Sequence, residues 1–116
     1  DISEYALANA KDEVKPFVQL GHAKKLDFPD HSFDFVVSLG TLHNLYVYDL
    51  RSALQEIQRV GKEKKYVAVE SYRSDSEMAN LLYWQLTCQS FHNPEEWEWV
   101  YQDTGYTGDF GFIFFE

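Results

Sequence analysis

Two short apolar runs flank a helix-like segment, and this arrangement limits the folds open to the chain. Phe33–Leu39 and Lys65–Tyr72 are rich in aromatic, β-branched and aliphatic residues, as is typical of strands buried on both faces of a parallel sheet. Asp49 is the expected cap of the helix between them, and Gly61 is its expected end. The residues of its apolar stripe recur at helical spacing: Leu50, Ala53, Leu54, Ile57 and Val60. Strand, helix and strand in this order predict an α/β fold, a doubly wound and mostly parallel sheet with helices on both faces.

Capping and turn residues predict five further elements. In chain order they are a helix from Ser3 to about Val14, a strand at Phe17–Leu20, a helix opened by Ser74 and running to about Phe91, a helix beginning at Asn93 and Pro94, and a strand at Gly111–Phe115. No internal repeat, low-complexity tract or linker interrupts them. We therefore interpret residues 1–116 as one domain.

The charge balance restricts the partners of the chain. It has 19 acidic residues against 10 lysines and arginines, a formal net charge of −9, which repels phosphate backbones and anionic lipid. We therefore expect neither nucleic acid nor a membrane as partner. Cys88 is the only cysteine, which excludes an internal disulfide and favours a reducing, cytoplasmic setting. The four histidines are not paired at ligand spacing, so we expect no metal site.

Three stretches carry a more specific signal when they are taken in order. The chain opens with Asp1-Ile2-Ser3, continues with the stretch from Gly21-His22-Ala23 to Phe28-Pro29-Asp30-His31-Ser32-Phe33-Asp34, and then reaches Ser38-Leu39-Gly40 and His43-Asn44. In this order and spacing they resemble class I S-adenosylmethionine-dependent methyltransferases. The resemblance runs from the end of the family's second strand to its last strand and covers essentially the whole chain.

The resemblance implies a binding site for S-adenosyl-L-methionine. It makes Asp1 the acceptor for both ribose hydroxyls and Ile2 a residue packed on adenine. His22 stands where the family usually has the acid that receives the adenine amino group, and the backbone amide of Ala23 is a further adenine contact. Ser38, Leu39 and Gly40 then lie at a strand's carboxyl end, near the methionine part of the cofactor.

The same resemblance indicates where a methyl acceptor would lie. His43 and Asn44 follow the strand and are candidates for a proton acceptor or an orienting group, the alternative for His43 being an ordinary solvated loop residue. Glu70 and Tyr72 end the next strand and are candidate walls of the substrate pocket. The expected activity is methyl transfer to a small-molecule acceptor.

One departure from the family weakens that expectation for the chain alone. The first strand and its glycine-rich loop have no counterpart in the sequence, so we expect the isolated chain to be weak or inactive. The strand at Phe33–Leu39 would then keep an unpaired apolar edge, which favours a homo-oligomer, most simply a dimer. Two alternatives stay open: a non-catalytic fragment or assembly module of the same fold, and part of a nicotinamide-dependent oxidoreductase.

Overall fold

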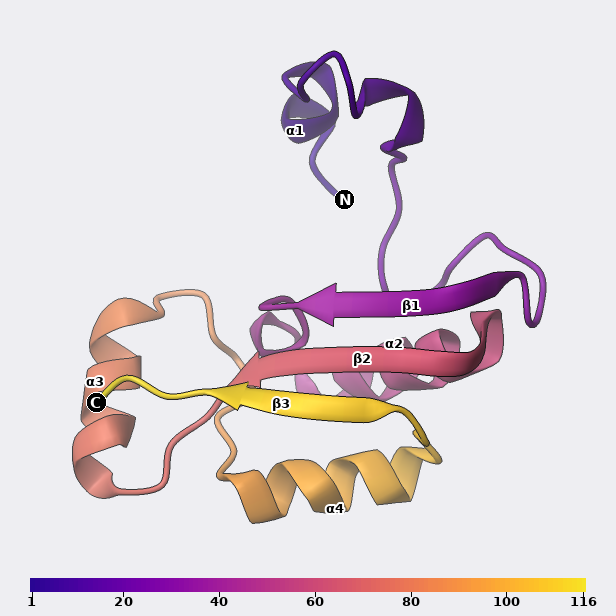
Figure 1. The fold of residues 1–116 in the computed structure, drawn as a ribbon. Helices are drawn as coiled ribbons and strands as arrows, with labels where there is room; N and C mark the ends of the chain where they lie inside the picture. The colour runs from indigo at the N-terminus through magenta and orange to yellow at the C-terminus, as the bar shows by residue number, and fades with distance from the viewer.

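Three parallel strands form the centre of the fold. The computed structural model describes all residues from 1 to 116, and in it β1 (Phe33–Leu39), β2 (Gly61–Glu70) and β3 (Asp109–Ile113) lie in the order β1-β2-β3 (Figure 1). Both neighbouring pairs are parallel, with Val37 opposite Tyr66 and Val67 opposite Phe110. The predicted α/β class and parallel sheet are therefore confirmed.

Four α-helices and two short 3₁₀ turns accompany these strands. They are α1 (Glu4–Ala8), η1 (Lys15–Phe17), η2 (Leu42–Asn44), α2 (Val47–Val60), α3 (Asp75–Trp84) and α4 (Pro94–Thr104). Of these, α1 and η1 precede β1, and the others lie between strands. No helix is both long enough and apolar enough to cross a membrane.

Helix α2 confirms the predicted apolar stripe, all five residues of which are buried. The predicted cap is wrong, because the N-cap position lies three residues earlier, at Tyr46, which makes no side-chain bond. Asp49 lies instead in the first turn and forms an ion pair with Lys24, with 3.2 Å between Nζ and Oδ1. Gly61 ends the helix in an extended conformation, so the chain enters β2 directly.

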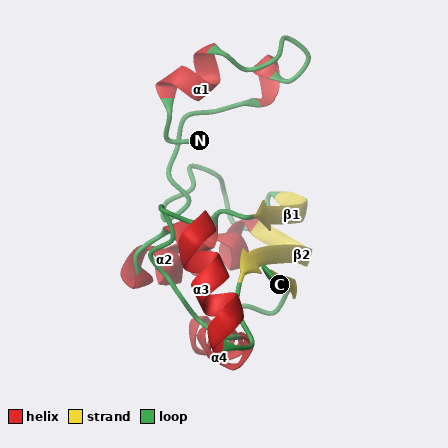
Figure 2. Cartoon of the chain, turned by 90° about the vertical axis from the view of Figure 1, so that its left-hand side faces the viewer, coloured by secondary structure: helices red, strands yellow, loops and turns green.

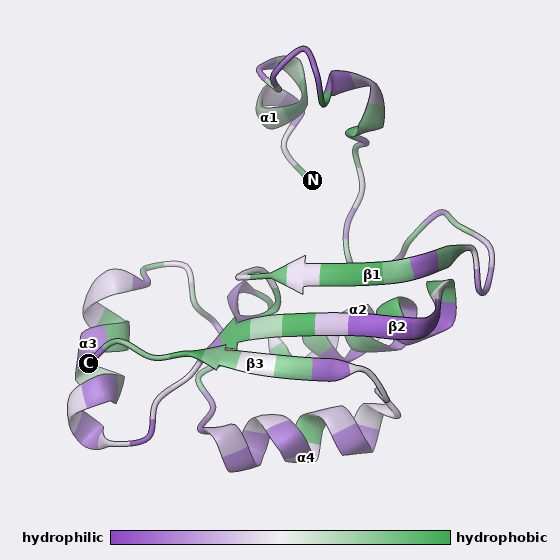
Figure 3. Cartoon of the chain, viewed as in Figure 1, coloured by the Kyte–Doolittle hydropathy of each residue, from purple (hydrophilic) through white to green (hydrophobic).

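The core fills the space between the sheet and α2 and α4, which pack on the same face (Figure 2). Val67 and Val69 of β2 contribute to it, together with the fully buried Trp97 of α4. The opposite face, which a doubly wound sheet would cover with further helices, is open in this structure. Figure 3 shows that most of β1 and the carboxyl half of β2 are hydrophobic.

Strand β1 is consequently more exposed than its composition predicts. Phe35, Val37 and Leu39 are 59%, 44% and 62% exposed, respectively, so the expectation of burial on both faces is wrong. The physical reason is that they project from the uncovered face, opposite Lys64, Tyr66 and Ala68 of β2. The other edge of β1 has no strand partner, and the expected dimer stays a prediction.

Residues 1–20, called the arm below, extend away from the sheet (Figure 1) and contain no buried residue. Ser3 caps α1 as predicted, its Oγ accepting from the Ala6 N–H at 3.1 Å. The helix ends at Ala8 rather than Val14, and Phe17–Leu20 does not form a strand. Lacking a packed apolar face, the arm has little to stabilise a longer helix.

The last third of the chain follows its capping signals closely at α4. Asn93 and Glu96 form a complete capping box, and Gly105 ends the helix in a left-handed conformation with φ 74°. At α3, Ser74 caps the Glu77 N–H, but the Glu77 carboxylate bonds Arg73 instead of completing the box. Helix α3 also stops at Trp84, short of the predicted Phe91.

Candidate functional site

A hollow of about 600 Å³ lies between the arm, the loop that follows it and the loop after β1. Its lining comes from three segments that are distant in the sequence: Asp1 and Ile2; Gln19 to Ala23 with Lys25 to Phe28; and Thr41, Asn44 and Leu45. Five of the predicted site residues are among them, namely Asp1, Ile2, His22, Ala23 and Asn44. The fold therefore brings the predicted nucleoside-binding residues together.

Asp1 is held in place by backbone bonds to the end of the arm. Its amino group donates to the Gln19 carbonyl at 3.0 Å, and the Gly21 N–H donates to the Asp1 carbonyl at 2.8 Å. This is the pattern of bonds around one residue of a parallel strand pair. The Oδ1 atom accepts from the Ser3 N–H at 2.8 Å, which leaves Oδ2 as the carboxylate oxygen without a partner.

His22 and Ala23 both present donors. The Lys24 N–H donates to His22 Nδ1 at 3.1 Å, so in the neutral ring the proton lies on Nε2. With Nδ1 occupied and the proton on Nε2, the neutral ring offers a donor rather than an acceptor, and the cofactor-binding role of His22 stays a prediction. The Ala23 N–H has no acceptor within the chain and is available to a ligand.

The loop after β1 forms the third wall. Gly40, with φ 62°, turns the chain out of the strand and keeps a bond from its N–H to the Ala68 carbonyl at 3.0 Å. Asn44 donates to the Gly40 carbonyl at 3.4 Å and accepts from Thr87 Oγ1 at 2.9 Å. Ser38, Leu39 and Gly40 lie just before this wall, at the end of β1, but do not line the hollow.

His43 lies elsewhere, in the interior, with its side chain fully buried. The Glu70 N–H donates to Nδ1 at 3.2 Å, and Nε2 lies 3.2 Å from Glu70 Oε2. Burial lowers the pKa of His43 and outweighs the opposing effect of Glu70, so the ring is neutral. Neither nitrogen faces solvent: Nδ1 already accepts from the Glu70 N–H, and Nε2, which carries the proton in the neutral ring, is buried beside Glu70 Oε2. In this structure the ring therefore cannot take a proton from a methyl acceptor.

Glu70 and Tyr72 do not line the hollow either. Glu70 is buried, and its Oε1 accepts from Gln85 Nε2 at 2.6 Å. The Tyr72 side chain is half-buried, and this burial raises its pKa, with smaller contributions from Glu96 and Asp75. Together with His43, Glu70 ties the ends of β1 and β2 to the segment after α3, which makes it a structural residue in this conformation.

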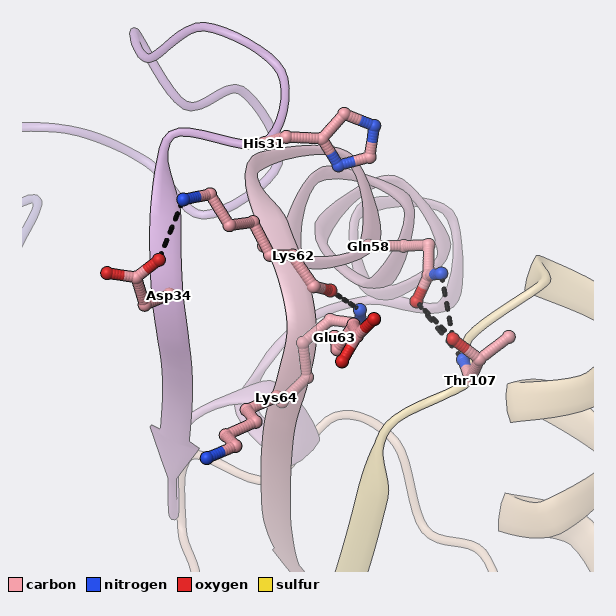
Figure 4. A pocket seen from close by; sticks show the side chains of 9 residues that line it. His31, Asp34, Gln58, Lys62, Glu63, Lys64 and Thr107 are labelled. Atoms are coloured by element: carbon pink, nitrogen blue, oxygen red, sulfur yellow. Dashed lines mark hydrogen bonds and ion pairs between the residues drawn. The ribbon is translucent and has the colours of Figure 1, made fainter.

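A second hollow, of about 700 Å³, opens at the amino ends of the strands (Figure 4). None of its nine lining residues is apolar, and two pairs cross it: Lys62 with Asp34 at 2.7 Å, and Gln58 with Thr107 at 2.9 Å. It contains no predicted site residue. Parallel α/β sheets bind ligands at the carboxyl ends of their strands, so the hollow beside the arm is the better candidate.

Two residues of α2 shape the candidate hollow without lining it. Glu56 accepts from the Leu26 N–H at 2.7 Å, and Arg59 donates to the Leu26 and Phe28 carbonyls at 2.9 and 2.7 Å. Arg59 also bonds Glu56 itself and lowers the pKa of that carboxyl group. The sequence reasoning missed this pair, and it missed Asp27 between the two clamped residues, because only the folded chain brings α2 beside this loop.

Comparison with known proteins agrees with the arrangement of the hollow. No curated protein matches the chain closely enough to count as a relative. Residues 1–69, which include every segment of the hollow, match the family model described as a methyltransferase domain. Because this match spans more than half of the 116 residues, the chain belongs to the methyltransferase domain family.

Proposed function

We propose that this chain takes part in S-adenosylmethionine-dependent methyl transfer to a small-molecule acceptor, with the hollow beside the arm binding the adenosyl end of the cofactor. The observation that supports the proposal most is the meeting of Asp1, Ile2, His22 and Ala23 around one hollow. Membership of the methyltransferase family leaves the nicotinamide-dependent alternative without support.

The residues present fit an adenosyl group. Asp1 Oδ2 is a charged acceptor for a ribose hydroxyl, and the Ala23 N–H is a donor for a ring nitrogen. The apolar part of the lining offers a surface for the flat base: Ile2, Leu20, Ala23, Leu26, Phe28 and Leu45. The bound cofactor would supply the electrophilic methyl group, and the chain's residues would orient it and exclude water.

Residues 1–116 hold fewer groups for the methionine end. The sequence contains no glycine-rich loop, and the open edge of β1 leaves no wall on that side of Ser38, Leu39 and Gly40. We infer that these residues alone bind the cofactor weakly and transfer methyl groups slowly or not at all. Asn44 is the one predicted catalytic residue that reaches the hollow, where it would orient an acceptor rather than remove a proton.

The test is a titration of the ¹⁵N-labelled chain with S-adenosylhomocysteine, followed by amide shifts. We expect dissociation constants well above micromolar, with the largest shifts at Ile2, His22 and Ala23. Asp1→Ala removes the charged ribose acceptor and should weaken binding about tenfold. Asp12→Ala, an exposed change outside the hollow, is the matched control.

Different results of the titration would contradict different parts of the proposal. Shifts spread over the second, polar hollow would contradict the assignment of the site. Equal affinity in the Asp1 and Asp12 variants would remove Asp1 from it. Micromolar affinity in the unmodified chain would contradict the inference that residues 1–116 bind weakly.

A further inference from the structure

Asp27 is an exposed lining residue of the hollow whose carboxylate has no partner in the chain. It lines the hollow between Leu26 and Phe28, and it forms no hydrogen bond or ion pair with any other residue. Most other carboxylates near this loop are engaged: Asp30 and Glu56 with Arg59, and Asp49 with Lys24. An unpaired acceptor in a hollow is available to a ligand that carries a donor.

The backbone on both sides of Asp27 is fixed from α2. Leu26 is held at its N–H by Glu56 and at its carbonyl by Arg59, and the Phe28 carbonyl accepts from the same guanidinium. These three bonds, between 2.7 and 2.9 Å, hold the two neighbours of Asp27 against a rigid helix. The backbone position of Asp27 is therefore set by its bonded neighbours and α2.

Most of the other polar groups of the hollow are donors or are already bonded, so few acceptors are free for a ligand. His22 Nε2 and the Ala23 N–H are donors, and the Asn44 Oδ1 atom is already bonded to Thr87. Asp1 lies beside Gly21 with one oxygen occupied by Ser3. The free Asp1 Oδ2 is assigned to a ribose hydroxyl in the proposed function. Asp27 is then the remaining carboxylate that can accept from the exocyclic amino group of a base.

We propose that Asp27 accepts a hydrogen bond from the exocyclic amino group of a purine nucleoside bound in the hollow, and that Glu56 and Arg59 are the positioning residues for it. The inference rests on the proposed function and adds a residue that determines which base is accepted. His22, whose free nitrogen is a donor, then contacts a ring nitrogen or the solvent instead.

The experiment compares two nucleosides that differ in one group. Adenosine carries the 6-amino group, and purine riboside has hydrogen in its place. Amide shifts of the labelled chain give dissociation constants at millimolar ligand. We expect Asp27→Ala to weaken adenosine binding about tenfold, as for one hydrogen bond to a charged acceptor, and to change purine riboside binding less than twofold. Asp27→Asn, which keeps an acceptor oxygen, should lose less, and Asp12→Ala should lose nothing.

The clamp is tested in the same assay. Arg59→Lys keeps the charge but not the two-armed guanidinium, so exchange of the Leu26 amide should accelerate. In that background Asp27→Ala should alter adenosine binding less than twofold, because the carboxylate is no longer held in place.

Each remaining outcome overturns a definite statement. If Asp27→Ala weakens both nucleosides equally, or neither, Asp27 does not read the amino group, while the hollow still binds nucleosides. If the unmodified chain binds neither nucleoside, the hollow is not a nucleoside site, and the proposed function falls together with this inference. If Asp27→Ala retains its full effect in the Arg59→Lys background, the clamp does not position Asp27.

Discussion

Replacement of His43 should reveal how much the buried His43–Glu70 pair stabilises the fold. His43→Ala leaves the Glu70 N–H without its acceptor and opens a cavity beside a buried carboxylate. An unpaired buried donor costs about 1–3 kcal/mol and the cavity about 1 kcal/mol more, so we expect a loss of about 2–4 kcal/mol. His43→Asn, whose Oδ1 lies near the former position of Nδ1, should lose about 1 kcal/mol.

The same pair predicts a pH dependence with a definite sign. Burial lowers the pKa of His43 in the folded chain below the ordinary value of 6.5, so as the pH falls the unfolded chain takes up the proton first. The contribution of neutral His43 to the stability of the fold is therefore complete above about pH 6.5, and it is lost as the pH falls through the pKa of His43 in the folded chain. The slope reaches at most about 1.4 kcal/mol per pH unit for one proton.

Urea unfolding followed by tryptophan fluorescence measures both effects, because Trp97 is fully buried in the core. The unmodified chain should lose stability between pH 7 and 5, while His43→Asn should lose less. The other histidines contribute equally to both chains. Only the difference between the two losses of stability is therefore assigned to His43. Parallel curves for the two chains over this range would refute the reasoning.

The buried core, the cap of α4, the Cys88 thiol and the open edge of β1 each give one further prediction. Leu54→Ala, at a fully buried position, should destabilise the chain by about 2–5 kcal/mol in urea unfolding, against less than about 1 kcal/mol for the half-exposed Leu82→Ala. Asn93→Ala removes the side-chain half of the capping box with Glu96 and should cost about 1 kcal/mol by the same measurement. Burial raises the pKa of the Cys88 thiol to about 11, so iodoacetamide at pH 8 should alkylate it much more slowly in the native chain than in urea. Light scattering should give twice the monomer mass of 13.6 kDa if β1 pairs with a second copy, and the monomer mass itself would contradict the expected dimer.

The elements that the sequence predicted well are those with strong local signals. The stripe of α2 and the Asn93 capping box are periodic or capped within a few residues, and both are confirmed. The strand predicted at Phe17–Leu20 in the arm was wrong for the opposite reason. The segment has strand-forming residues but no continuous partner strand. His43 illustrates the limit for the site: its place after a strand suggested a ligand contact, but burial against Glu70 depends on packing that no local pattern encodes.

Helix α2 links the stability of the core to the shape of the candidate site. One side of it buries Leu54 and Ile57 under the sheet, while Glu56 and Arg59 reach the loop that contains Asp27. That loop contributes no residue to the buried core cluster and takes its shape from those two side chains. A loop held by surface hydrogen bonds opens at lower free energy than the core that supports it. The wall of the hollow should therefore exchange its amides before the sheet does, and a nucleoside that slows this exchange must bind the clamped form of the loop.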